Sequence, residues 1–279
     1  MSIFVGTSGY NYPEWKGSFY PADLAAAKML PYYAARFPTV EINYTFYRMP
    51  SVKLLDGWKK QVPASFKLTL KAPRRITHDA KLANCEKLTA EFCLVAGTLG
   101  DQLGALLFQL PPSLKKDLPR LDAFLDTLPP KAPAAFEFRH PSWFDAEVFA
   151  HLKQRGRALC VADSEKLETP LEVTADFGYF RLRDEGYQPA DIEEWARKIA
   201  PLQDKCKDIY VYFKHEEKGI GPEFAKLLMK NLELGIGDWK YVVLRDSRLD
   251  CRLLRDRWAA RGESSTVAQS RDPALFLHA

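Results

Sequence analysis

Apolar and polar residues alternate along several short stretches of the chain, most clearly from Ala134 to His140. Phe136 and Phe138 occupy one face of this stretch, whereas Glu137 and Arg139 occupy the other, because successive side chains of a strand point to opposite faces. Strand-like runs of this kind are predicted at Ile3–Ser8, Thr39–Phe46, Phe66–Lys71, Gly104–Leu110, Ala134–His140, Ala158–Ser164, Phe177–Arg183 and Asp208–His215.

Between these runs, apolar residues recur at the three- and four-residue spacing of an amphipathic helix. The clearest helices are predicted at Asp23–Phe37, Val52–Gln61, Leu82–Leu99, Leu118–Leu128, Asp145–Gln154, Pro189–Asp204 and Pro222–Leu232. The sixth connection, Glu165–Asp176, is too short and too polar to predict a helix.

Strands that alternate with helices predict a parallel sheet with right-handed crossovers. Eight such units indicate an α/β protein with a single-domain (β/α)8 TIM barrel, a fold that takes about 250 residues. The chain has 279 residues, which leaves room for a C-terminal extension. The alternative is an open doubly wound sheet, but Gly6-Thr-Ser-Gly9 lacks the glycine spacing of its usual first turn.

In a barrel of this type the apolar face of each strand meets the helices, and the other face lines the axis. The alternation therefore predicts a polar lining, and most of its members stand near the carboxyl ends of their strands, where active sites of this fold are built. The predicted inner residues are Glu41, Asn43, Lys71, Gln109, Glu137, Arg139, Asp163, Arg181 and Lys214.

This lining predicts a binding site for a small anion. Lys71, Arg139 and Arg181 would form a cationic ring if they share a level, and guanidinium groups suit carboxylate or phosphate. Candidate acids and bases beside the ring are Glu41, Glu137 and Asp163. Further candidates for binding or orienting substrate are Asn43, Gln109, Lys214, His140 and Trp143, the last two from the loop after the fifth strand.

Other interpretations of the lining stay open at this point. Buried charges persist only when they are paired, hydrated or liganded, so a purely structural salt-bridge network is one alternative. No cofactor is predicted, because the five histidines form no H-x-H or H-E-x-x-H pair. A Mg²⁺ ion held by Glu41, Glu137 and Asp163 is a further alternative.

Composition narrows the class of protein. The net charge of +4 is modest, so it fits a small anionic ligand and does not require nucleic acid. No apolar run approaches the ~20 residues of a membrane span, and the first residues lack the plan of a signal peptide. Five scattered cysteines without a C-x-x-C pair predict a reducing, cytoplasmic setting.

The regular pattern of the barrel, residues 1–232, stops after Leu232. We expect residues 233–279 to form an extension that is partly disordered or packed on the barrel, with one strand-like run at Tyr241–Leu244. This extension is rich in arginine, and together with Arg74 and Arg75 it raises the alternative of a nucleic-acid-associated protein. Acidic residues interleaved in the same segment argue against that alternative.

A set of motifs runs in order along the chain: Gly6–Tyr10 with Trp15, Val40–Tyr47, Lys71–His78, Phe108–Pro112, Glu137–Trp143 and Ala162–Ser164. This set resembles the YecE-like family, also called domain of unknown function 72. The resemblance implies a TIM barrel of bacterial type and no particular reaction. The chain departs from the family pattern at Arg183, where a histidine is expected, and beyond Leu232.

The leading hypothesis is an enzyme that binds a small phosphorylated or carboxylated molecule at the C-terminal mouth of the barrel. Lys71, Arg139 and Arg181 would hold the anion, while Glu41 and Glu137 would act as acid and base. Hydrolysis, isomerisation and lyase chemistry are all compatible with these residues. A non-catalytic binding barrel is the remaining alternative.

Overall fold

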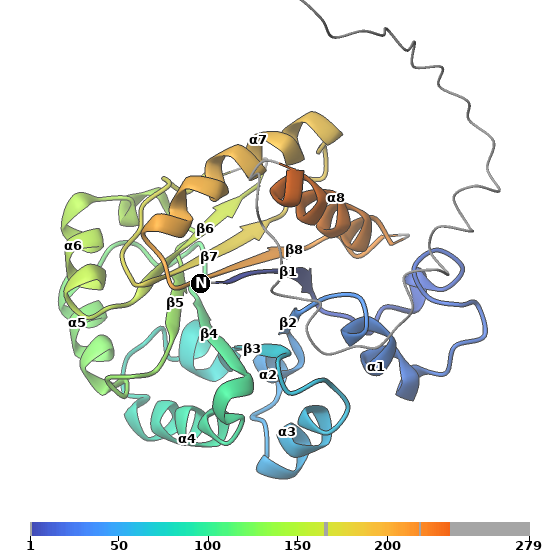
Figure 1. Ribbon diagram of the computed structural model, residues 1–279. Coiled ribbons are helices and arrows are strands. Elements are labelled where there is room, and N and C mark those ends of the chain that lie inside the picture. The colour runs from blue at the N-terminus through green and yellow to red at the C-terminus, as the bar shows by residue number, and fades with distance from the viewer. Residues whose placement is uncertain (1, 165–166, 218, 235–279) are drawn as a thin grey trace, which may run out of the picture. The chain divides into compact units, whose positions relative to one another are not determined.

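The computed structural model describes residues 2–164, 167–217 and 219–234. Its parallel strands form a closed barrel in chain order, with the last strand paired to the first (Figure 1). The strands are β1 Ser2–Ser8, β2 Thr39–Ile42, β3 Lys67–Lys71, β4 Leu103–Gln109, β5 Ala134–Glu137, β6 Ala158–Asp163, β7 Phe177–Leu182 and β8 Asp208–Phe213. The predicted (β/α)8 barrel is confirmed.

Helices surround the strands (Figure 1). The α-helices are α1 Met29–Ala34, α2 Tyr44–Tyr47, α3 Val52–Lys59, α4 Glu86–Gly97, α5 Leu118–Thr127, α6 Ala146–Gln154, α7 Pro189–Ile199 and α8 Ile220–Leu234. Short helical turns lie at η1 Pro13–Trp15, η2 Ala26–Lys28, η3 Arg75–Asp79, η4 Gly100–Gln102, η5 Pro141–Trp143 and η6 Ala200–Asp204, and η3 is a π-helical turn.

Local sequence fixes where several of these helices begin. Ser51, Asp117 and Asp145 stand just before α3, α5 and α6, and each side chain accepts a hydrogen bond from a first-turn backbone N–H. Such caps satisfy donors that have no partner inside the helix, and each contributes about 1 kcal/mol. The crossovers therefore start at defined residues, which fixes the length of the preceding loops at the mouth of the barrel.

The outer strand faces pack against the helices in one continuous apolar cluster. Phe108 and Phe136 stack with ring centres 5.3 Å apart on neighbouring strands, and Phe124 of α5 meets the ring of Phe108 edge-on. Burying each of these side chains contributes about 1.5–3 kcal/mol. This packing explains the alternation that the sequence displays, because the same strands turn their polar residues toward the axis.

A second cluster fills the lower interior of the barrel. Tyr179, Tyr210 and Tyr212 of β7 and β8 lie inside it, opposite small residues that β4, β5 and β6 contribute. These small residues are Ala105, Ala135, Ala158, Cys160 and Ala162. The Tyr212 hydroxyl is shared between the hydroxyls of Thr39 and Thr69, at 2.8 and 2.7 Å. Below the polar mouth, the axis is therefore closed by a packed plug.

The predicted boundaries were wrong at three places near the mouth. β2 ends at Ile42, and α2 follows where the sequence predicted strand as far as Phe46. β5 ends at Glu137, so Arg139 and His140 belong to the following loop. In the predicted helix Asp23–Phe37, only the stretch from Ala26 to Ala34 is helical. Alternation alone cannot detect these ends, because a short helical turn can continue the same pattern.

The connection between β6 and β7 has no helix among its described residues, as the sequence predicted. No helix in the described part of the chain is long and apolar enough to cross a membrane. The predicted extension lies almost entirely outside the described residues, and with it the strand-like run at Tyr241–Leu244 and the arginine-rich stretch.

Candidate functional site

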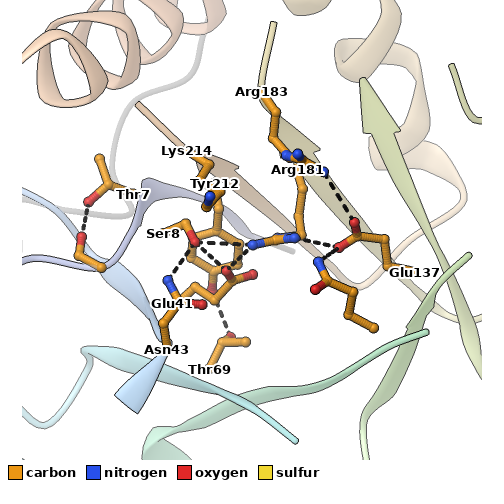
Figure 2. Close-up of polar contacts among 12 residues, drawn as sticks. Thr7, Ser8, Glu41, Asn43, Thr69, Glu137, Arg181, Arg183, Tyr212 and Lys214 are labelled. Carbon is orange, nitrogen blue, oxygen red and sulfur yellow. Dashed lines mark hydrogen bonds and ion pairs between the residues drawn. The ribbon is translucent and has the colours of Figure 1, made fainter. Parts of the chain in front are cut away.

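The centre of the site is an ion-pair bridge across the barrel mouth. The guanidinium group of Arg181, on β7, lies between Glu41 of β2 and Glu137 of β5 (Figure 2). Its Nη2 donates to Oε1 of Glu41 at 2.9 Å, and its Nη1 donates to Oε2 of Glu137. All three residues are fully buried. Burial lowers the pKa of Arg181, but Glu137 and Glu41 outweigh this effect, and the net result is a raised pKa.

Both oxygens of Glu41 are engaged. Oε1 also accepts a hydrogen bond from the Ser8 hydroxyl at 2.5 Å, and Oε2 accepts one from the Tyr179 hydroxyl at 2.5 Å. Ser8 in turn accepts the Nδ2 of Asn43 at 2.9 Å. The Oδ1 of Asn43 is buried and has no donor among the described residues. Glu41 is therefore held in place by its neighbours, while Asn43 offers a free acceptor.

Glu137 is surrounded by cations. Its Oε2 accepts Nε2 of Gln109 at 2.8 Å, and its Oε1 lies 3.0 Å from Nε of Arg139 and 3.5 Å from Nη1 of Arg183. Burial would raise the pKa of Glu137, but Arg181, Arg139 and Arg183 together hold it well below its usual range. A carboxyl in this setting stays ionised at neutral pH.

Lys71, at the end of β3, is placed differently from these residues. Its Nζ lies 4.1 Å from the centre of the Phe46 ring, and no carboxylate among the described residues pairs with it. Burial and the charge of Arg181 lower its pKa to about 7, against the opposing effect of Glu137 and Glu41. At neutral pH a substantial fraction of Lys71 is therefore an uncharged amine.

The loop after β2 sets this environment. Thr45 of α2 donates its hydroxyl to the backbone carbonyl of Lys71 at 2.7 Å, which ties α2 to the end of β3. The next residue, Phe46, is thereby held against the Lys71 ammonium group. Phe46 also contacts His78 of η3, whose ring meets it edge-on with centres 4.9 Å apart. Burial and nearby cations, first Lys71, lower the pKa of His78.

Cations outnumber carboxylates at the mouth. Arg139, Arg181 and Arg183 surround Glu41 and Glu137, and Lys71 adds a further basic group. The side chains of Arg139 and Arg183 are 29% and 25% exposed, so part of each guanidinium faces solvent. Lys214, at the end of β8, lies 3.6 Å from Glu216. Around the ion-pair bridge itself, basic groups therefore outnumber the two carboxylates.

Two predicted site residues lie elsewhere. Asp163 shares a face with Leu159 and Val161, and that face points outward, to α7. Its Oδ2 accepts the Tyr187 hydroxyl at 2.5 Å and the Trp195 indole N–H at 3.3 Å. The prediction of Asp163 as an inner catalytic acid was wrong. The Mg²⁺ alternative loses its basis too, since its three carboxylates do not converge.

Trp143 is buried, its ring stacks on Phe138 with centres 4.7 Å apart, and its indole N–H donates to the carbonyl of Leu114. It therefore holds the loop after β5 and does not face the site, which corrects its predicted role in binding. His140 braces the same loop, because its Nδ1 accepts the backbone N–H of Ser142 at 3.2 Å. Glu41, Asn43, Lys71, Gln109, Glu137, Arg139, Arg181 and Lys214 do occupy inner strand positions or the loops at the mouth.

Three partners in the network, Ser8, Tyr179 and Arg183, were not among the candidate site residues. Alternation places Tyr179 and Arg183 on the same face as Arg181, and Arg183 directly follows the end of β7. Ser8, at the end of β1, was not considered. What alternation cannot supply is the distance across the barrel, on which the bond of Tyr179 to Glu41 depends, or the strand register that sets Ser8 directly beside Glu41.

The closed parallel barrel and the polar residues at the carboxyl ends of its strands define a TIM-barrel protein. The sequence matches the family described as proteins of unknown function DUF72 over residues 4–241, and the chain belongs to this family. The family pattern therefore continues past Leu232, where the sequence predicted that it ends.

Relatives with similar sequences are bacterial. The chain is 30% identical over 168 residues to UPF0759 protein YecE of Escherichia coli K12, a match that covers 58% of this chain and 59% of that protein. The aligned part is less than two thirds of the relative's length. UPF0759 protein YunF of Bacillus subtilis is 24% identical over 83% of this chain and 95% of its own length.

A solved structure of the family has the same fold. The DUF72 family protein TM1631 of Thermotoga maritima is 28% identical, with a TM-score of 0.76 over 84% of this chain and all of the other. A DUF72 family protein of Enterococcus faecalis, 19% identical with a TM-score of 0.71 over 89% of this chain and all of the other, also shares the fold.

Proposed function

We propose that the chain is an enzyme that binds a small anionic molecule, phosphorylated or carboxylated, at the C-terminal mouth of the barrel. The observation that carries this proposal is the surplus of cations: three guanidinium groups, Arg139, Arg181 and Arg183, surround only Glu41 and Glu137. Arg139 and Arg183 are partly exposed, so an anion can reach them without breaking the buried bridge.

The bridge residues are proposed to position the site and not to transfer protons. Glu137 is a weak base because its pKa lies well below the usual range, and both oxygens of Glu41 already accept hydrogen bonds. This replaces the expectation that these two glutamates act as acid and base. Lys71, whose pKa is about 7, is the better matched reactive group, since catalytic groups work best when their pKa is near the working pH.

The anion site is tested by ligand-dependent stability. Inorganic phosphate at millimolar concentration should raise the thermal midpoint of the wild type, because a ligand that binds only the folded state stabilises it. The increment should be lost in the double variant Arg139→Ala, Arg183→Ala. Arg155→Ala is the matched control, because Arg155 is similarly exposed, at 24%, and pairs with Asp122 and Asp126 between α5 and α6. Equal increments in all three proteins would refute the anion site.

Catalysis is tested separately, by following a mixture of small phosphorylated and carboxylated metabolites by proton NMR. If the wild type converts a compound and Lys71→Met converts it at least tenfold more slowly, the chain is an enzyme with Lys71 as its reactive group. Phosphate-dependent stabilisation without turnover of any compound supports a binding barrel instead. The nucleic-acid alternative has no support in the described residues, since Arg74 pairs with Asp79 at 3.1 Å and the arginine-rich segment lies outside them.

A further inference from the structure

Lys71 differs from the other lysines in the described part of the chain by its surroundings. Lys116, Lys198, Lys207 and Lys214 each pair with a carboxylate, and Lys67 donates to the carbonyl of Asp101 at 2.6 Å. Most other lysines are exposed to solvent. Lys71 is half-buried inside the barrel, and its Nζ faces the ring of Phe46 and has no carboxylate within ion-pair distance among those residues.

This placement favours the uncharged amine. An aromatic face stabilises an ammonium group only partly, and three neighbouring guanidinium groups lie on the same mouth. Burial, together with the charges of Arg181 and Arg139, lowers the pKa of Lys71 to about 7. Lysines that are desolvated and placed beside other cations are the ones that react as nucleophiles at neutral pH.

We propose that Lys71 is a nucleophilic amine that forms an imine with an aldehyde or ketone carrying a carboxylate or phosphate. This inference rests on the proposed anion site and names the class of substrate for it. Arg139 and Arg183 hold the anionic end, which orients the carbonyl carbon toward Nζ of Lys71.

The step is balanced without any further reagent. The Nζ lone pair of Lys71 attacks the carbonyl carbon, a C–N bond forms, and the carbonyl π electrons move to oxygen. Proton transfer from nitrogen to oxygen and loss of water then give the imine. Protonated, this imine withdraws electrons from the adjacent carbon, so that a C–H or C–C bond there can break. The ring of His78 also contacts Phe46, and burial and the charge of Lys71 lower its pKa.

The experiment is reductive trapping. The full chain is incubated at pH 7.5 with pyruvate, glyoxylate or glyceraldehyde 3-phosphate, and separately with acetone or glycolaldehyde as uncharged counterparts. Sodium cyanoborohydride reduces any imine to a stable secondary amine, and peptide mass spectrometry locates it. We expect Lys71 to be labelled at least tenfold faster than exposed Lys53 or Lys60 by an anionic carbonyl, and not by the uncharged ones.

Two variants complete the test. The double variant Arg139→Ala, Arg183→Ala should lose the preference for anionic carbonyls but keep labelling at Lys53 and Lys60. Lys71→Arg should lose the fast label while its thermal midpoint still rises with inorganic phosphate. The imine is refuted if Lys71 reacts no faster than the exposed lysines. In that case phosphate decides how much else is refuted. If phosphate still stabilises the wild type and not the double variant, only the imine is refuted. If phosphate does not stabilise the wild type, the anion site is refuted as well.

Discussion

The hydroxyl of Tyr179 donates a hydrogen bond to Oε2 of Glu41 at 2.5 Å, although β7 and β2 are not neighbours in the barrel. Both side chains are fully buried. The bond thus crosses the axis and ties opposite walls of the barrel together. It also occupies the carboxylate oxygen that Ser8 and Arg181 leave free.

Tyr179→Phe should destabilise the fold by about 1.5–3 kcal/mol, because hydrogen bonds to charged groups contribute that much. Tyr20→Phe is the control, since the buried Tyr20 hydroxyl donates to a neutral carbonyl, that of Tyr10, at 2.5 Å. Its expected loss is about 0.5–1.5 kcal/mol. Urea unfolding of both variants measures the difference. Equal losses would mean that the charge on Glu41 adds nothing to the bond.

Arg181→Met should cost about 3–5 kcal/mol, because it leaves Glu41 and Glu137 buried without their shared partner. The triple variant Arg181→Met, Glu41→Gln, Glu137→Gln should recover much of this loss, since it removes the uncompensated charges as well. Equilibrium denaturation of the two proteins checks the prediction. A triple variant less stable than the single one would show that unpaired charge is not the source of the loss.

Glu137→Gln should change how stability depends on acid. The pKa of Glu137 is lower in the folded than in the unfolded chain, so its contribution is fully present above about pH 4.5 and declines as the pH falls toward the folded-state pKa. The stability difference between wild type and Glu137→Gln should therefore be larger at pH 7 than at pH 3. Exposed Glu91→Gln serves as control and should show no comparable change.

Lys71→Met tests the same kind of linkage at higher pH, but here the substitution should stabilise the fold. The folded-state pKa of Lys71 is about 7 and the ordinary value is 10.5, so between these limits the unfolded chain binds more protons. Wild-type stability should rise with pH in this window, by at most about 1.4 kcal/mol per pH unit. The variant should be most stabilised relative to wild type at pH 7 and below, and this advantage should shrink toward pH 10. Exposed Lys60→Met should show no such trend.

Asp163→Asn tests whether Asp163 supports the outer packing of the barrel and not the site at the mouth. Asp163 accepts hydrogen bonds from Tyr187 and Trp195, so the substitution should loosen the packing of α7 and lower stability by about 1–3 kcal/mol. Phosphate-dependent stabilisation should be unchanged, because the Asp163 side chain bonds Tyr187 and Trp195. Its contact with Arg183 is made by the backbone carbonyl, which the substitution keeps. Loss of phosphate binding at preserved stability would contradict the outward placement.

The alternation of apolar and polar residues was sufficient to predict the barrel and most of its charged lining. Glu137 and Arg181 stand at inner positions because Phe136 and Phe180 fill the outer ones. Strand six was the exception. Its inner residues, Ala158, Cys160 and Ala162, are small and apolar, so the polar Asp163 was assigned to the wrong face.

The roles of the charges could not be predicted from the sequence. Lys71, Arg139 and Arg181 were expected to form one cationic ring. In the structure Arg181 forms ion pairs with two carboxylates, whereas Lys71 has no carboxylate partner among the described residues. That difference follows from which side chains face each other across the axis. Such pairs are far apart in sequence, and Arg181 and Glu41 are separated by 140 positions.

The plug of tyrosines and small residues beneath the ion-pair bridge means that side-chain protons of the network exchange with bulk water through the mouth. Tyr212, held by Thr39 and Thr69, closes the axis from below, so protons on Arg181 and Tyr179 can leave only toward the mouth or when the barrel opens. Their exchange lifetimes in deuterated water therefore report how often the mouth opens. A bound anion that covers Arg139 and Arg183 would lengthen those lifetimes without contacting Arg181 or Tyr179.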